Sequence, residues 1–215
     1  MAISTYTELR TAIADWTDRT DLTSYLDDFI AQAESYFKLP PVKPNEQGIG
    51  GIRTNITRAT GTLSTSASTL ARPADFMEAY RFDLTGTNGA PLEYVNAEQL
   101  MLAFREGSGQ PRFWTVSDVI EFDVIPDAAY AYEMSYYPDF TGLSGSNADN
   151  WVLLNHPNLY LSGCLYQAYT FLLDERRADR WLAQYKSIAY GATRAYDRSR
   201  RSQGPIAAKV DVATP

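Results

Sequence analysis

Hydrophobic side chains recur with helical spacing near the start of the chain. The first apolar run follows Thr5 and has steps of three or four positions: Tyr6, Leu9, Ile13 and Trp16. Thr5 and Glu8 have the spacing of a capping box, in which each side chain satisfies a backbone amide of the first turn. A second run ends before a proline-rich segment: Leu26, Phe29, Ile30, Ala33 and Phe37. We therefore predict two amphipathic helices, the second ended by Pro40 and Pro41.

Helical spacing returns after residues 138–150, a loop dense in glycine, serine and asparagine. One helix is predicted over about Pro157–Leu173, with proline at an early position where its missing amide costs nothing. A second helix is predicted over about Glu175–Arg201. After Gly204 the helical pattern stops, and we expect an extended or disordered tail.

The middle of the chain is rich in threonine, valine, tyrosine and phenylalanine, broken by glycine, proline and asparagine. This texture is typical of short strands. A short helix over Ala97–Arg105 interrupts them, with Leu100, Met101 and Phe104 on its apolar side. The predicted strands are Ile52–Arg58, Thr62–Leu70, Phe76–Leu84, Arg112–Val116, Val119–Val124 and Tyr130–Tyr137.

These elements predict an α+β fold. The helices of both ends cannot bury their apolar stripes alone, so we expect them to pack together as a helical bundle around an inserted small antiparallel β lobe. The expected divisions are residues 1–47 for the first helices, 48–140 for the β lobe with its short helix, 141–203 for the last helices, and 204–215 for a flexible tail.

Composition narrows the class of protein. The 215 residues are 45% hydrophobic and 21% charged, as in a globular chain that buries a core. No run of about 18 apolar residues occurs, so no membrane span is expected. The first ten residues lack the basic and apolar regions of a secretory signal, so none is expected either.

The net charge of −7 is unevenly distributed. Residues 1–173 carry a balance of −11, whereas residues 174–215 carry +4. This asymmetry argues against a general nucleic-acid binder and favours a C-terminal end that meets an acidic partner. A solvated helix face accounts for the same charges equally well.

Candidate catalytic and ligand-binding residues are few. His156 and Cys164 are the single histidine and cysteine, which excludes an internal disulfide and a multi-histidine metal site. We interpret His156 as a surface or cap residue, and Cys164, on an apolar stripe, as a buried structural thiol. The segment Gly48–Gly51 lacks the lysine and hydroxyl residue of a phosphate loop. No catalytic, metal or cofactor site is predicted.

Glu121 and Asp123 form the one close acidic pair in the strand region. Alternation along a strand would place both carboxylates on the same face. A hydrolase acting on cell wall or nucleic acid would need such a pair in a cleft, but a solvated strand face is the preferred interpretation.

Tyrosine is unusually frequent, with fifteen copies. Its ring favours burial while its hydroxyl favours water, a combination typical of interfaces. A carbohydrate-stacking platform is the alternative. Because the tyrosines are spread along the chain, we favour subunit interfaces, with four candidates on one predicted strand: Tyr130, Tyr132, Tyr136 and Tyr137.

Several stretches, in order along residues 5–200, resemble the head-to-tail adaptor (connector) proteins of tailed bacteriophages and gene transfer agents. Residues 14–22 look like the turn after that family's opening helix, and Asp28–Glu34 is similar to its second helix. In place of an Arg-rich segment, residues 38–52 here are rich in proline and glycine, which leaves their path open. The other matching segments are Tyr6–Leu9, Leu70–Phe76, Pro91–Val95, Gly109–Arg112, Tyr136–Pro138, Trp151–Leu154 and His156–Leu161.

The resemblance implies a structural virion protein and not an enzyme. It implies a dodecameric homo-oligomeric ring beneath the portal protein at the head-tail neck, assembled in the host cytoplasm, which docks tail, nozzle or tail-terminator proteins. It also implies a lumen through which genomic DNA passes without specific binding. The alternative is a carbohydrate-binding or hydrolytic virion module. The candidate portal contacts are Arg198, Arg200, Arg201, Ile206, Lys209, Val210 and Val212.

Overall fold

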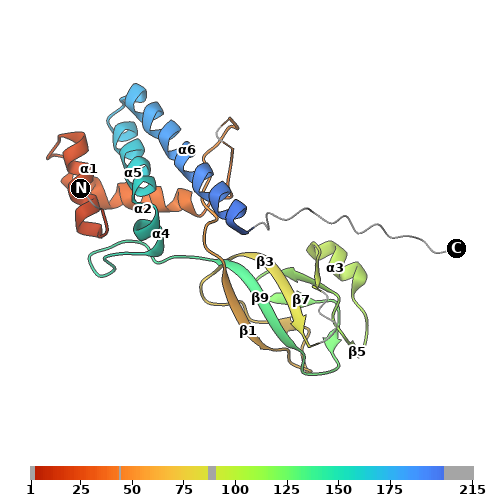
Figure 1. The fold of residues 1–215 in the computed structure, drawn as a ribbon. Coiled ribbons are helices and arrows are strands. Elements are labelled where there is room, and N and C mark those ends of the chain that lie inside the picture. Colours follow the sequence, from red (N-terminus) through yellow and green to blue (C-terminus); the bar gives the residue numbers. More distant parts are fainter. Residues whose placement is uncertain (1–2, 44, 87–90, 201–215) are drawn as a thin grey trace.

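The computed structural model describes residues 3–43, 45–86 and 91–200. Helices from the two ends of the chain lie together on one side, and the strands of the middle form a separate lobe on the other (Figure 1). The prediction of a mixed α+β fold is confirmed. The helices are α1 (Tyr6–Thr17), α2 (Leu26–Phe37), α3 (Ala97–Ala103), α4 (Trp151–Asn155), α5 (Pro157–Phe171) and α6 (Glu175–Arg200), with a 3₁₀ turn η1 (Thr23–Tyr25) before α2.

Helix α5 lies at the centre of the helical side. It packs against α1, α2, α4 and α6, and a single cluster of buried side chains joins these helices. Because α5 has neighbours around most of its surface, its middle is buried nearly all round, from Leu159 to Leu165. Phe37 of α2 shows the packing: its ring meets Tyr160 of α5 edge-on at 4.7 Å and stacks on Tyr185 of α6 at 6.1 Å.

Local sequence signals set the helix ends. The predicted capping box is confirmed, since the Glu8 amide donates to Thr5 Oγ1 at 3.3 Å and the Thr5 amide donates to Glu8 Oε2 at 3.1 Å. Helix α5 begins at the predicted proline, Pro157. The short helix α4 was not predicted as a separate element; it is capped by Asn150, whose Oδ1 accepts from the Leu153 amide at 2.9 Å.

The β lobe consists of small sheets around its own core. The first sheet has the order β1 (Thr57–Thr62), β9 (Ala131–Pro138), β3 (Phe76–Thr85), and both pairings are antiparallel. The second has the order β2 (Thr69–Leu70), β7 (Ile120–Phe122), β6 (Phe113–Val116), β4 (Glu93–Tyr94), and β5 (Ser108–Gly109) pairs with β8 (Ile125–Pro126). The buried core is Leu63, Phe82, Leu84, Leu92, Trp114, Ile120, Phe122, Met134 and Tyr136.

The lobe departs from a purely antiparallel arrangement at two short pairings. Strand β4 runs parallel to β6, and β5 runs parallel to β8. A parallel pair needs a crossover connection, and α3 lies in the connection from β4 to β6. The short inserted helix was predicted, but the parallel pairing of β4 with β6 that it allows was not.

Two predicted strands are placed differently. The segment predicted over Ile52–Arg58 becomes a strand only from Thr57, because Ile52 and Arg53 are buried against the helical side instead. The segment predicted over Thr62–Leu70 is mostly a loop, and only Thr69–Leu70 pairs, with β7.

Gly51 and Ile52 lie alongside the C-terminal end of α2 and the residues just after it. The Gly51 amide donates to the Pro40 carbonyl, and the Ile52 amide donates to the Phe37 carbonyl, both at 3.2 Å. A Cβ atom at Gly51 would lie 2.2 Å from the Leu39 oxygen and 2.3 Å from the Phe37 oxygen. Glycine is therefore required for this close backbone approach. Over the described ranges, no helix is both long and apolar enough to cross a membrane.

Candidate interaction surface

The connection between the helices and the β lobe is organised by Arg53. Its side chain is only 6% exposed, and its Nε donates to Glu78 Oε2 on β3 at 2.7 Å. The same guanidinium also donates to main-chain carbonyls around the end of α2 and to its own neighbour: Lys38 at 3.2 Å, Leu39 at 3.1 Å and Ile52 at 2.9 Å. Five donors in a rigid fork suit this many acceptors. Arg53 thus attaches the β lobe to the helical side.

Helix α6 extends to this junction. The Arg53 amide donates to Thr193 Oγ1 of α6 at 3.2 Å. About two helical turns further along α6, Arg200 lies over the ring of Tyr80 on β3, with its Cζ 4.4 Å from the ring centroid. The C-terminal end of α6 therefore reaches β3, as Figure 1 shows.

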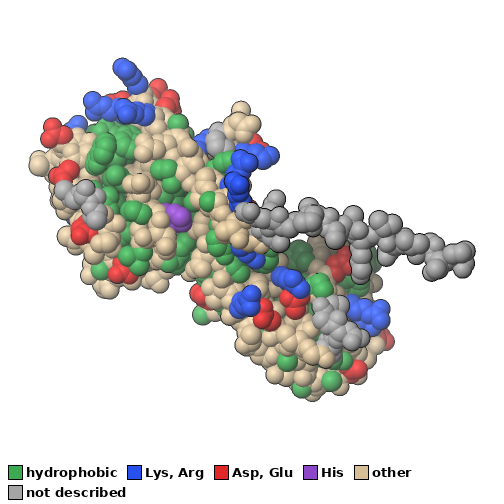
Figure 2. Space-filling model, in the orientation of Figure 1, with side chains coloured by type: hydrophobic (Ala, Val, Ile, Leu, Met, Phe, Trp, Pro, Cys, Tyr) green, Lys and Arg blue, Asp and Glu red, His purple; other side chains and the backbone are tan. Residues whose placement is uncertain are grey.

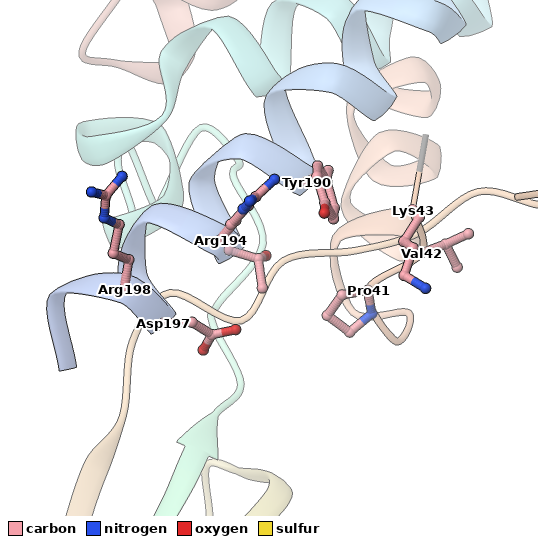
Figure 3. A pocket seen from close by; sticks show the side chains of 8 residues that line it. Pro41, Val42, Lys43, Tyr190, Arg194, Asp197 and Arg198 are labelled. Carbon is pink, nitrogen blue, oxygen red and sulfur yellow. The ribbon is translucent and has the colours of Figure 1, made fainter. Parts of the chain in front are cut away.

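A basic hollow of about 580 Å³ lies between the C-terminal half of α6 and the segment that follows α2. Figure 3 shows Arg194 and Arg198 extending from α6, with Asp197 between them in sequence, and Lys43 opposite. Lys43 pairs with Glu46 at 3.2 Å, and the Arg194 guanidinium lies 6.0 Å from the Tyr190 ring. In the part of the chain that the structure describes, neither arginine has a carboxylate within ion-pair distance.

Lysine and arginine side chains gather where α6 approaches the β lobe (Figure 2). Of the predicted portal contacts, Arg198 and Arg200 lie here, both exposed. The other predicted portal contacts lie outside the described residues: Arg201, Ile206, Lys209, Val210 and Val212.

Two of the four tyrosines predicted to lie at a subunit interface are buried in the single chain. Tyr136 and Tyr137 are 4% and 8% exposed, so both are packed inside the chain and present little surface to a second subunit. Tyr136 donates to Asp75 at 2.8 Å, and burial together with that carboxylate raises the pKa of Tyr136 to about 12. Tyr130 and Tyr132 are half-buried and keep accessible surface.

A more exposed apolar surface lies on α3. Of the three residues expected on its apolar side, Leu100 is buried, whereas Met101 and Phe104 are 80% and 51% exposed. Leu102 is 89% exposed. This seven-residue helix packs on β6 and buries only Leu100. Its other large apolar side chains therefore face solvent. A group of exposed apolar side chains is typical of surfaces that contact other molecules.

The acidic pair on β7 does not form a solvated face. Asp123 follows the end of β7 and is fully buried, so the strand alternation that would align it with Glu121 stops before it. Its Oδ1 accepts from the amides of Arg112 at 2.9 Å and Phe113 at 3.2 Å, and its Oδ2 accepts from Arg105 at 3.0 Å. The Glu121 carboxylate accepts from Ser117. Asp123 is a structural acceptor between strands.

The single histidine and cysteine occupy the predicted structural positions. His156 links α4 to α5 as a cap residue, and its Nε2 lies 3.2 Å from Thr54 Oγ1. Burial lowers the pKa of His156. Cys164 is fully buried on α5, and this burial raises the pKa of its thiol, which disfavours the nucleophilic thiolate.

A family model described as SU10 adaptor protein matches residues 4–209, which is nearly the whole chain. A search of curated proteins found no match to this chain.

Proposed function

The chain belongs to the SU10 adaptor protein family, a family of phage head-to-tail adaptors, and from this premise we propose that it forms a ring beneath the portal. An adaptor role is a structural role in the virion. The observation that carries the proposal is the family match over residues 4–209. The exposed arginine-rich end of α6 supports it. In the ring, each copy extends the DNA channel and offers a platform to the tail.

A ring requires two different surfaces on each copy that fit one another and close by rotation. The exposed carboxylates of the first helices supply one such surface, and the exposed arginines of α6 supply charge of the opposite sign. Tyr130 and Tyr132 of the β lobe are further proposed contacts. The acidic residues are Asp15, Asp18, Asp21, Asp27 and Asp28. Complementary charge of this kind fixes the order and register of neighbours.

We assign portal contact to the end of α6 that carries Arg198 and Arg200, and to the residues that follow it. Arg198 has a guanidinium suited to a carboxylate of the portal. Ile206, Val210 and Val212 are proposed apolar contacts beyond it, with Arg201 and Lys209 as basic ones, on the basis of the sequence alone.

The tail platform is assigned to the exposed apolar surface of α3, at Met101, Leu102 and Phe104. This surface and the proposed portal contacts Arg198 and Arg200 belong to different elements, α3 and the end of α6 (Figure 1). Contacts on different elements would let one copy hold portal and tail at the same time. Genomic DNA passes through the lumen, and no catalytic step is assigned to any residue.

Electron microscopy of the protein mixed with its portal tests the proposal directly. We expect portals that carry a ring of additional density, and an Arg198→Glu variant that decorates the portal at least about tenfold less at equal concentration. Arg180→Glu, an exposed charge reversal near the other end of α6, is the matched control and should decorate portals normally. A stable dimer that ignores portal would contradict the ring, and equal effects of the two variants would contradict the assignment of α6.

A further inference from the structure

The β lobe contains an open groove lined by aromatic side chains. It lies between β3 and the β4–β6 edge of the second sheet and has a volume of about 580 Å³. Tyr80 and Tyr94 on its two walls are 50% and 58% exposed, while Trp114 at its base is buried. The apolar and aromatic lining residues are Phe76, Met77, Tyr80, Tyr94, Trp114 and Val116.

Both walls of the groove are outer strand edges. β3 is the last strand of its sheet, and a bridge between Asp83 and Pro91 covers only its C-terminal end. Among the described residues, no strand pairs with the outer edge of β3 from 76 to 81. On the opposite wall, β4 covers β6 only at Phe113 and Trp114. Open edges present backbone N–H and C=O groups that an extended peptide can pair with.

The end of α6 delivers the chain to this groove. Tyr80 is both a wall of the groove and the ring on which Arg200, the last residue of α6, is placed at 4.4 Å. Residues 201–215 follow directly. At about 3.3 Å per residue, an extended segment of nine residues spans about 30 Å, more than the length of the six-residue edge of β3.

The sequence of that segment has the two-residue period of a strand. Its larger apolar residues occur at alternate positions, and the charged residues Lys209 and Asp211 lie between them. In an extended conformation this pattern creates one apolar face and a second face that carries Lys209 and Asp211 together with Ala207 and Ala213. The apolar positions of the alternating set are Ile206, Ala208, Val210 and Val212.

We propose that residues 205–213 dock in this groove of their own chain as an added strand. The apolar face, with Val210 and Val212, contacts the wall formed by Tyr80 and Tyr94, and the backbone pairs with the outer edge of β3. The chain's own segment is the occupant because its attachment at Arg200 gives it a high effective concentration at the groove. This inference does not depend on the adaptor function.

The docked segment has a consequence for assembly. Val210 and Val212 cannot contact the groove and a portal at the same time, so portal binding by these residues would require release from β3. The groove then holds the segment in the free protein and protects an aromatic surface and an open strand edge that would otherwise favour edge-to-edge association.

Hydrogen exchange on the full-length chain tests the proposal. The double variant Val210→Ser/Val212→Ser alters the face assigned to the groove, and Lys209→Ser/Asp211→Ser alters the intervening positions as the matched control. We expect amides of β3 from 76 to 81 to exchange at least about tenfold faster in the valine variant and to change by less than about twofold in the control. Equal behaviour of the two variants, including no change in either, would overturn the proposal.

Two further measurements identify the occupant. Tyr94→Ala should accelerate exchange at the same β3 amides, whereas Met101→Ala, on the exposed face of α3, should not; the reverse order would overturn the groove assignment. Protection of α5 reports whether each variant remains folded. Docking within one chain makes β3 protection independent of protein concentration. Protection that rises with concentration would show that the segment of a second copy fills the groove, against the proposal.

Discussion

The carboxylate of Glu34 on α2 accepts a hydrogen bond from the hydroxyl of Tyr160 on α5 at 2.8 Å, across 126 positions of sequence. The same oxygen, Oε1, accepts from the Leu143 amide at 2.7 Å, and Asn150 donates to the Tyr160 hydroxyl at 2.7 Å. Glu34 is only 9% exposed, and this burial raises the pKa of its carboxyl. One buried polar network therefore joins the first helices, the central helix and the loop before α4.

This network predicts how the stability of the protein changes with pH. Because the pKa of Glu34 is raised in the folded state, the ionised carboxylate is disfavoured there. The folded state therefore binds a proton at Glu34 more readily than the unfolded state does. Glu34→Gln removes that penalty and keeps an acceptor for Leu143. We expect the unfolding free energy of wild type, relative to this variant, to increase as pH falls from neutral to below 4.5, and to decrease as pH rises. Urea denaturation at several pH values measures the difference.

Tyr160→Phe separates the hydrogen bonds from the charge. It leaves Asn150 and Glu34 with one partner fewer in a buried site, which should cost about 1–3 kcal/mol. A flat difference between wild type and Glu34→Gln across this pH range would contradict the assignment of the raised pKa to Glu34.

At the junction between the helices and the β lobe, we expect substitution of Arg53 to lower stability more than substitution of its ionic partner Glu78. Arg53 is buried and its removal leaves several main-chain carbonyls without a donor, so Arg53→Ala should lower stability by about 2–4 kcal/mol. The Glu78 side chain is 49% exposed, so Glu78→Gln should cost less than about 1 kcal/mol. Chemical denaturation of both variants measures the ratio. Equal losses would show that the ion pair, and not the carbonyl contacts, dominates the role of Arg53.

The backbone approach at Gly51 predicts a position that tolerates no side chain. Gly51→Ala would force Cβ against two main-chain oxygens, which cannot move without shifting the end of α2, so we expect a loss of about 3 kcal/mol or more. Gly145→Ala is the control, because a Cβ there meets nothing within 4 Å and its φ is not positive; it should change stability by less than about 0.5 kcal/mol. Thermal melting of both variants compares them.

The charge distribution predicts weak contact with DNA. Tight, salt-sensitive binding arises when several Lys or Arg side chains neutralise phosphates, and in the proposed ring such contacts would hinder the passage of DNA. The balance of −11 over residues 1–173 disfavours them. Fluorescence anisotropy with duplex DNA near physiological salt should therefore show no appreciable binding by the free protein. Sub-micromolar binding that disappears when Arg194, Arg198, Arg200 and Arg201 are replaced would make the end of α6 a DNA contact instead.

Local sequence patterns were sufficient to predict features that depend only on residues within one or two helical turns. The capping box of Thr5 and Glu8, the apolar stripe of α2 and the start of α5 at Pro157 were all predicted and are confirmed. Each depends on spacing within one or two helical turns, and that spacing is present in the sequence itself. The family resemblance is likewise confirmed by the match over residues 4–209.

Patterns were insufficient where two faces of an element look alike. Met101 and Leu100 are adjacent apolar residues of α3, yet Leu100 is buried and Met101 is 80% exposed. Tyr132 and Tyr136 are four positions apart on β9, so strand alternation places them on the same face. They differ in burial because Phe76 and Asp75 contact Tyr136. The expected divisions of the chain and the portal contacts after residue 200 stay predictions.

The sequence by itself determined the helices at the two ends of the chain, the strand-rich middle and the family. The tertiary structure alone decided that Arg53 would be buried against three carbonyls, that Asp123 would be enclosed between strands, and that α6 would end over Tyr80. The physical reason is the distance along the chain over which each effect acts. Helix and strand periodicities act over a few residues. Burial of a charge or an aromatic ring depends on segments from about 10 to more than 100 positions away, whose approach is set only when both cores are packed.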